Sequence, residues 1–190
     1  AHDLRSPLNR LMTRLDVTLM GDNNKEEYRE ALVQTMAETD ELLKTFNALL
    51  LIGEAESGLD RSKLELVDLS TRLCDVVELY LPAAEDAGLV MSMDIAPDLQ
   101  VRGNPNLISQ AIVNLLDNAL KYTPEAGTVR IEAGIGEAGA PYVLVADSGP
   151  GIPEADRERV LNRFVRLESS RSSPGSGLGL SLVAAVAKLH

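Results

Sequence analysis

The first 57 residues carry two apolar stripes with helical spacing, and one pair of such helices cannot bury both. In the first stretch, steps of three and four residues separate Leu4, Leu8, Leu11, Leu15 and Leu19. Turn residues follow at 21–24. The second stretch carries on one side Tyr28, Leu32, Met36, Leu42, Leu43, Phe46, Leu49 and Leu50. The pattern favours an antiparallel helical hairpin over 1–57 that forms a homodimer as a four-helix bundle. A plain coiled-coil linker would have the same pattern.

One of the chain's two histidines lies at the start of this hairpin. In His2-Asp3 the imidazole Nε2 can attack an electrophile while the Asp3 carboxylate holds the Nδ1 proton and stabilises the developing cation. A lone His-Asp pair is more often a surface feature, so other motifs must decide. The second histidine, His190, ends the last expected helix without an acidic neighbour, and we expect a structural or solvent-facing role for it.

Charge and cysteine content argue against a nucleic-acid-binding protein and exclude a fold held by an intramolecular disulfide. With 18 basic and 29 acidic residues the net charge is −11, which argues against extended nucleic-acid binding. The single cysteine, Cys74, allows no intramolecular disulfide and has apolar neighbours, so we expect it to fill core space. We see no signal peptide and no apolar run long enough for a membrane span, and expect no membrane contact from this segment. A start inside a helix without Met indicates a piece of a longer protein.

Glycine and charged residues around Glu54 to Arg61 predict a hinge, which we place at 58–63, before a second domain at 64–190. Strands are expected at 64–69, 89–95, 99–102, 128–133 and 142–146, and helices at 70–87, 104–122, 153–164 and 179–189. Asn104 and Pro105 fit the start of the helix at 104–122. A mixed sheet with helices on one face is the expected α+β solution.

Two polar motifs in this second half have the chemistry of a nucleotide site. Asn114 and Asn118 are four residues apart on one helix face, and their neutral amide oxygens suit a Mg²⁺ ion already bridged by phosphates. Lys121, near that face, can meet phosphate charge. Asp147 follows a β-rich run and can accept from an amino group such as adenine N6, with Gly149 and Gly151 after it. Taken singly, these motifs also fit a polar helix flank and an ordinary turn.

Two further motifs complete the series. The first is the run 162–166, which contains Phe164 and Arg166. The second is Gly175-Ser-Gly177-Leu178-Gly179, which leads into a helix whose N-terminal backbone amides can cradle phosphate. Its spacing matches neither the dinucleotide fingerprint nor the P-loop.

In this order and spacing, the motifs resemble those of bacterial two-component sensor histidine kinases, specifically the dimerisation and phosphoacceptor hairpin followed by a Bergerat-type ATP-binding domain. Residues 2–8 resemble the H box, 114–122 the N box, 147–151 the first glycine box, Phe164 and its neighbours the F box, and 175–179 the second glycine box. The resemblance covers nearly the whole chain.

The resemblance implies a role for each matching residue. His2 would be the phosphoacceptor, Asp3 and Ser6 its catalytic neighbours, and Asp147 the adenine reader. Asn118 would be the principal Mg²⁺ ligand, with Asn114 assisting. Residues 167–177 would form the ATP lid. Other nucleotide contacts would come from Lys121, Tyr122, Gly149, Gly151, Phe164, Arg166, Gly175, Gly177, Leu178 and Gly179.

The implied function is ATP-dependent autophosphorylation of His2 in a cytoplasmic homodimer, followed by transfer to an aspartate of a response regulator receiver domain. The parent protein would be anchored in the inner membrane. Family members usually continue into further strands after the second glycine box, so the sheet is expected to lack its last strands. Ser6 stands where members that dephosphorylate their partner usually have Thr or Asn, which leaves phosphatase activity open.

Two other functions fit the same motifs. A Bergerat-fold ATPase of the chaperone and topoisomerase kind would need a glutamate at position 114, where Asn114 cannot take a proton from water. A non-catalytic phosphotransfer or scaffold dimer with a vestigial ATP domain is opposed by the intact Asn118, Asp147 and Gly177, and favoured by the expected lack of the last strands.

Overall fold

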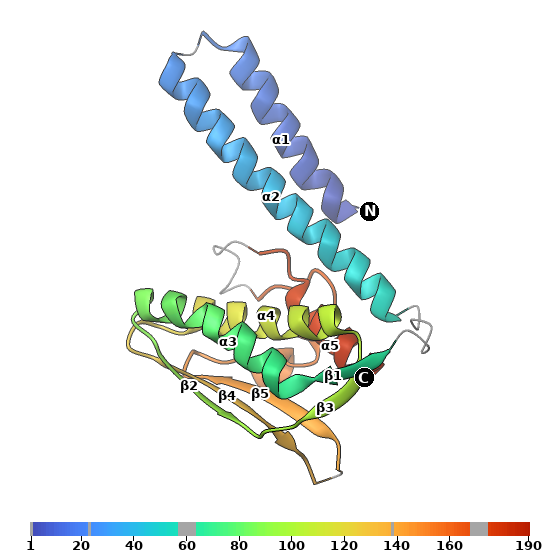
Figure 1. Cartoon of the computed structure of the whole chain (residues 1–190). Helices are drawn as coiled ribbons and strands as arrows, with labels where there is room; N and C mark the ends of the chain where they lie inside the picture. The colour runs from blue at the N-terminus through green and yellow to red at the C-terminus, as the bar shows by residue number, and fades with distance from the viewer. Residues whose placement is uncertain (1, 23, 57–63, 138, 168–174) are drawn as a thin grey trace.

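The computed structural model describes residues 2–22, 24–56, 64–137, 139–167 and 175–190, with the backbone alone at 2–5 and 7. The expected hinge at 58–63 and most of the expected lid therefore lie outside the described residues. A long helical hairpin projects from a compact second half in which three helices cover one side of the strands (Figure 1). Within the described residues, no helix is both long and apolar enough to cross a bilayer.

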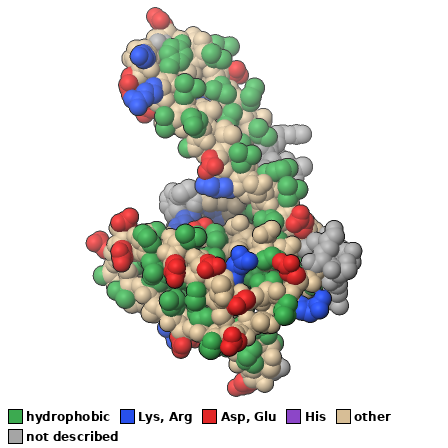
Figure 2. Space-filling model, in the orientation of Figure 1, with side chains coloured by type: hydrophobic (Ala, Val, Ile, Leu, Met, Phe, Trp, Pro, Cys, Tyr) green, Lys and Arg blue, Asp and Glu red, His purple; other side chains and the backbone are tan. Residues whose placement is uncertain are grey.

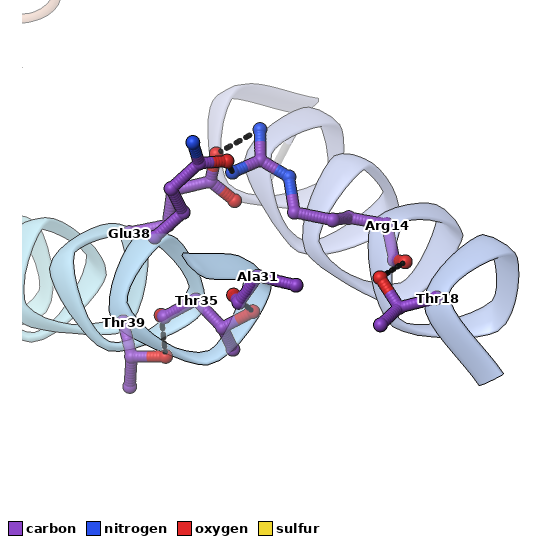
Figure 3. A network of polar contacts seen from close by, with 7 residues as sticks. Arg14, Thr18, Ala31, Thr35, Glu38 and Thr39 are labelled. Carbon is purple, nitrogen blue, oxygen red and sulfur yellow. Dashed lines mark hydrogen bonds and ion pairs between the residues drawn. The ribbon is translucent and has the colours of Figure 1, made fainter. Parts of the chain in front are cut away.

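The hairpin consists of α1 (His2–Met20) and α2 (Lys25–Glu56), as the apolar stripes predict. Asn24 begins α2, because its side-chain oxygen accepts from the backbone N–H groups of Glu26 and Glu27 at 2.9 and 3.0 Å. Side chains of α1 and α2 also meet in a polar network (Figure 3). Arg14 contacts Glu38 at 2.8 Å and donates to Gln34 at 2.7 Å, which ties the two helices together.

The second half alternates strands and helices. In chain order its elements are β1 (Glu65–Asp68), α3 (Leu69–Asp86), β2 (Val90–Ile95), β3 (Gln100–Gly103), α4 (Pro105–Tyr122), β4 (Thr128–Ile135), β5 (Pro141–Asp147), the 3₁₀ turns η2 (Glu154–Asp156) and η3 (Arg159–Leu161), and α5 (Gly179–Leu189). The expected mixed sheet is present as β2-β4-β5, with β2 parallel to β4 and β4 antiparallel to β5. The strands β1 and β3 form a separate antiparallel pair.

The prediction of a helix at 153–164 is wrong, since the chain forms only the two 3₁₀ turns there. Half of the segment's residues are charged, and Val160 is its single buried side chain. One buried side chain cannot supply the continuous apolar stripe that stabilises an amphipathic helix by packing.

Two hydrophobic clusters hold the second half together. The larger fills the space between α3, α4 and the strands, with Leu73, Leu116 and Ile131 fully buried. The smaller lies between α4 and α5 and is built on Leu107, Leu178 and Leu182. Because α4 contributes to both clusters, the helix that carries the N box is fixed on two sides.

Candidate functional site

The N-box helix α4 begins at the cap that the sequence predicts. The side-chain oxygen of Asn104 accepts from the backbone N–H groups of Asn106 and Leu107 at 2.9 and 3.2 Å, and Pro105 occupies the first helical turn. His190 adds a further contact, because its Nε2 accepts the backbone N–H of Asn104 at 3.0 Å while Nδ1 lies 2.8 Å from the Val186 oxygen. His190 therefore has the structural role expected from the sequence and joins the end of α5 to the start of α4.

A hydrogen bond between two side chains fixes α4 against α3. The Tyr80 hydroxyl donates to Asp117 Oδ1 at 2.6 Å. Burial, followed by the hydrogen bond and charge of Asp117, raises the pKa of the Tyr80 phenol, so this group stays protonated and keeps its donor. Asp117 lies one position before Asn118, and the bond therefore helps to set the rotation of the N-box helix.

The structure brings the N box against the second glycine box. A Cβ added to Gly179 would lie 3.6 Å from the side-chain carbon Cγ of Asn114, and one added to Gly175 would lie 3.2 Å from Lys121 Nζ. Asn114 and Asn118 are both half-buried, whereas Lys121 is exposed and lies 4.9 Å from the centre of the Tyr122 ring. The Asn114 amide thus lies against the first residue of α5.

The first glycine box meets the end of the same helix. Asp147 is the last residue of β5, and its Oδ1 accepts the backbone N–H of Gly149 at 2.8 Å. A Cβ on Gly149 would lie 2.7 Å from both this oxygen and the Tyr122 carbonyl oxygen, so only glycine fits between them. Asp147 is exposed and lies at this junction with α4. Gly151 has a positive φ of 69° and open space around it.

The F box and the second glycine box close on each other. The Phe164 N–H donates to the Gly177 oxygen at 3.0 Å, and a Cβ on Gly177 would lie 2.8 Å from the Val165 oxygen. Phe164 has a φ of 62°, a strained value for a non-glycine residue. The neighbouring Leu178 is fully buried, and Arg166 is half-buried. These contacts fix both ends of the segment 165–177.

The structure describes the predicted phosphoacceptor segment at the start of α1 only in part. His2 and Asp3 lie in the first turn of α1, but their side chains are outside the described residues. Ser6 is exposed on the same helix. Figure 1 shows the start of α1 beside α2, apart from α4 and α5. The four nucleotide motifs therefore meet around α4, and the acceptor helix lies elsewhere.

The donor set around α4 fits a metal that arrives with phosphate. Among the described residues, no cluster of three or more His, Cys, Asp or Glu side chains could hold a metal ion by itself. Asn114 and Asn118 are neutral oxygen donors, which Mg²⁺ accepts when substrate phosphates supply the negative charge. The two amides are thus suited to magnesium bound together with a nucleotide.

The sequence did not predict that the end of α2 packs onto this half. Ile52 and Ala55 are buried in the smaller hydrophobic cluster with Leu107 and Leu182, and Glu56 pairs with Arg163. Ile52 continues the helical spacing of Leu42, Leu49 and their neighbours. That spacing is the same for a side chain facing α1, a second copy or another domain.

Comparisons with known proteins agree with the motifs. Residues 103–190 match the family model for histidine kinase-, DNA gyrase B- and HSP90-like ATPases. The sensor protein IrlS of Burkholderia pseudomallei is 30% identical over the whole chain, which covers 41% of that protein. The sensory kinase SasA of Synechococcus sp. is 35% identical over the whole chain, which covers 51% of it. The chain thus spans about half the length of these curated relatives or less.

Solved structures show the same likeness. The mycobacterial sensor histidine kinase MprB is 35% identical with a TM-score of 0.61, and the match covers 66% of this chain and 81% of that one. The Acinetobacter baumannii histidine kinase AdeS matches all of this chain and 87% of its own, with a TM-score of 0.73 at 24% identity, which supports the fold alone.

Proposed function

Because this chain belongs to the sensor histidine kinases and carries their ATP-binding domain, we propose that it transfers the γ-phosphoryl group of ATP to His2. The phosphoryl group then passes to an aspartate on the receiver domain of a response regulator. The observation that carries the proposal is the convergence of four nucleotide motifs on α4, with a histidine-aspartate pair on a separate helix.

Different residues around α4 bind different parts of ATP. Asp147 accepts from the adenine amino group, and Lys121 meets phosphate charge beside Gly175. Tyr122, Phe164 and Arg166 flank the site. Gly149 and Gly151 let the base approach the backbone, while Gly177, Leu178 and Gly179 shape the start of α5, whose amide groups face phosphate. Asn118, assisted by Asn114, would hold a Mg²⁺ ion, which would supply positive charge to the phosphates.

The transfer step needs little covalent chemistry from the protein. His2 Nε2 forms a bond to the γ-phosphorus, the bond from that phosphorus to the bridging oxygen breaks, and ADP leaves with the electron pair. Asp3 holds the Nδ1 proton and stabilises the imidazolium. In the second step, a receiver carboxylate attacks the phosphorus and His2 leaves. Ser6 lies one turn after His2 on the same helix.

We further propose three parts for the chain, namely a dimerisation and acceptor hairpin at 1–57, a hinge at 58–63 and the ATP-binding domain at 64–190. Dimerisation is supported by the large apolar side chains that the hairpin leaves exposed, among them Leu32, Met36, Leu43 and Phe46. A second copy would cover these side chains in a four-helix bundle. A cytoplasmic location follows for this segment from its need for ATP and a response regulator.

Labelling with ATP tests the proposal directly. The unmodified chain, incubated with γ-labelled ATP and Mg²⁺, should gain acid-labile label, as expected of a phosphohistidine. His2→Ala should abolish the label and leave nucleotide binding intact. His190→Gln is the matched control, because it removes the other histidine and keeps an acceptor for the Asn104 N–H. Label on the His2→Ala protein would overturn the acceptor assignment. Steady phosphate release without labelled protein would identify an ATPase instead.

A further inference from the structure

The helices α4 and α5 run antiparallel and meet at two points. His190, directly after α5, contacts the α4 cap residue Asn104. Asn114, in the middle of α4, lies against Gly179, the first residue of α5. At a rise of 1.5 Å per residue, the two contacts are separated by roughly 15 Å along α4 and roughly 16 Å along α5. Because these spacings are nearly equal, both contacts are satisfied at the same position of α5 along α4.

The apolar side chains between these contacts fix the distance between the two helices better than their register. The smaller hydrophobic cluster lies between α4 and α5 and contains Leu107, Ala111, Leu178, Leu182 and Val186. Apolar contact is non-directional, so it opposes the separation of two helices more strongly than a small slide. Packed helices shift against each other by about 1–2 Å in conformational transitions. A directional contact is therefore needed to hold a single register.

The imidazole of His190 supplies this directional contact. Its Nε2 accepts the backbone N–H of Asn104 at 3.0 Å, and its Nδ1 lies 2.8 Å from the backbone oxygen of Val186. With the proton on Nδ1, both ring nitrogens are paired, one within α5 and the other with the start of α4. The ring is thus fixed to its own helix and bonded to the neighbouring one.

Gly103, the last residue of β3, leaves the space that this ring occupies. A Cβ added at Gly103 would lie 2.3 Å from His190 Cδ2, 2.4 Å from His190 Nε2 and 2.8 Å from Ile108 Cδ1. Gly103 is not among the glycines with a positive φ, so the closeness of the ring, and not the backbone conformation, requires glycine here. The end of α5 accordingly lies beside β3 (Figure 1).

The opposite end of the helix pair carries the candidate phosphate contacts. The N-cap residue of α5 is Leu178, whose side chain cannot accept a hydrogen bond, so it does not cap the first backbone N–H groups of α5. Contacts to phosphate and metal need placement within about 0.5 Å. A slide of α5 along α4 moves these N–H groups relative to Asn114. It does not move Asp147, which belongs to β5.

We propose that His190, held against Gly103, is a positioning residue for the phosphates of ATP, because it sets the register of α5 on α4. This inference rests on the proposed function. His190 itself contacts no nucleotide and transfers no proton. It acts through the distance between Asn114 and the first turn of α5, so its removal affects recognition of the phosphates and not recognition of the adenine base.

Calorimetric titration of the full chain with two ligands tests this role. The ligands are ATP with Mg²⁺, and adenosine, which has the base without phosphates. His190→Ala should weaken the binding of ATP with Mg²⁺ by roughly three- to ten-fold, the range of one hydrogen bond, and leave adenosine affinity unchanged. His190→Gln keeps an acceptor in place of Nε2 and should retain the ATP affinity of the unmodified chain. Asp147→Asn should weaken the binding of both ligands.

Gly103→Ala tests the same contact from the other side. Its methyl group displaces the imidazole ring, so this variant should match His190→Ala in both titrations. The double variant should bind ATP no more weakly than either single variant, because the two changes break the same contact. Val77→Ala, in the larger hydrophobic cluster, is the control for lost stability and should leave both affinities unchanged. The number of sites per chain in each titration reports any unfolded fraction.

If His190→Ala does not fold, Gly103→Ala alone carries the comparison. Equal ATP affinity in the unmodified chain and in these variants would overturn the positioning role and leave the kinase assignment standing. A loss of affinity that is equally large for adenosine, or that also appears in His190→Gln, would overturn it as well. An unmodified chain that binds neither ligand would overturn the proposed function, and the positioning role with it.

Discussion

The two halves of the molecule differ in how far their large apolar side chains are buried. In the ATP-binding half, Leu116 and Ile131 are fully buried between helices and strands. In the hairpin, Met36 is 72% exposed and Leu32 is 59% exposed, and apolar patches follow the projecting helices in Figure 2. Monomeric proteins rarely leave extended apolar patches uncovered. The ATP-binding half therefore carries its own core, whereas the hairpin leaves many large apolar side chains exposed.

The end of α2 is the exception that connects the two halves. Ile52 and Ala55 lie on the hairpin's own helix and yet are buried against α4 and α5. A single helix thus has exposed apolar side chains along much of its length and buried ones at its end.

The largest expected effect comes from charging the uncovered surface. Leu43→Asp together with Phe46→Asp places two carboxylates where the second copy would pack, and each unpaired buried charge costs several kcal/mol. We expect a monomer by light scattering, with autophosphorylation close to background. Nucleotide affinity should be unchanged, since both residues are exposed within the chain and far from α4 in sequence. A dimer that survives both substitutions would place the partner surface elsewhere.

Truncating the core of the ATP-binding half should have a different result. Leu116→Ala creates a cavity in the larger hydrophobic cluster and should lower the free energy of unfolding of that half by about 2–5 kcal/mol. Leu43→Ala removes the same atoms from an exposed position and should leave the unfolding of that half unaffected. Denaturant unfolding of both variants measures the contrast. Equal losses of unfolding free energy in the Leu116→Ala and Leu43→Ala variants would show that the two halves unfold as one unit.

The sequence predicted most of the fold because local patterns were consistent with it. The cap at Asn104, the turn before α2 and the four nucleotide motifs rest on residue types with specific local geometry. The prediction of a helix at 153–164 was wrong because its charged residues have good helix propensity, although the segment lacks an apolar stripe. Contacts such as Ile52 with Leu182, or His190 with Asn104, depend on how distant elements pack, and no local pattern encodes them.

A smaller effect is expected at the adenine end of the site. Asp147→Asn replaces an acceptor-only carboxylate with an amide, which leaves the adenine amino group poorly paired and should weaken nucleotide binding by roughly 1–3 kcal/mol. Dimerisation should not change. Asp94→Asn, an exposed acid on β2, is the matched control and should bind nucleotide normally. Calorimetric titration measures both, and unchanged affinity in the Asp147 variant would remove this residue from the site.

The smallest effect concerns the bond between α3 and α4. Tyr80→Phe removes the hydrogen bond to Asp117 and should lower stability by about 1 kcal/mol at neutral pH. The folded state raises the pKa of Tyr80, so its contribution is complete below the ordinary tyrosine value of about 10 and declines as the pH rises beyond it. The difference in unfolding free energy between the unmodified protein and the Tyr80→Phe variant should thus decrease in alkaline solution. A difference that stays constant with pH would contradict this assignment.

The most direct test of the contrast between the halves is the mass of the unmodified chain in solution. Light scattering across the micromolar range should give twice the monomer mass of 20.5 kDa, because in the proposed dimer a second copy covers the apolar face of the hairpin. The isolated segment 64–190 should be a monomer at the same concentrations. A full chain that stays monomeric while binding nucleotide would contradict the account.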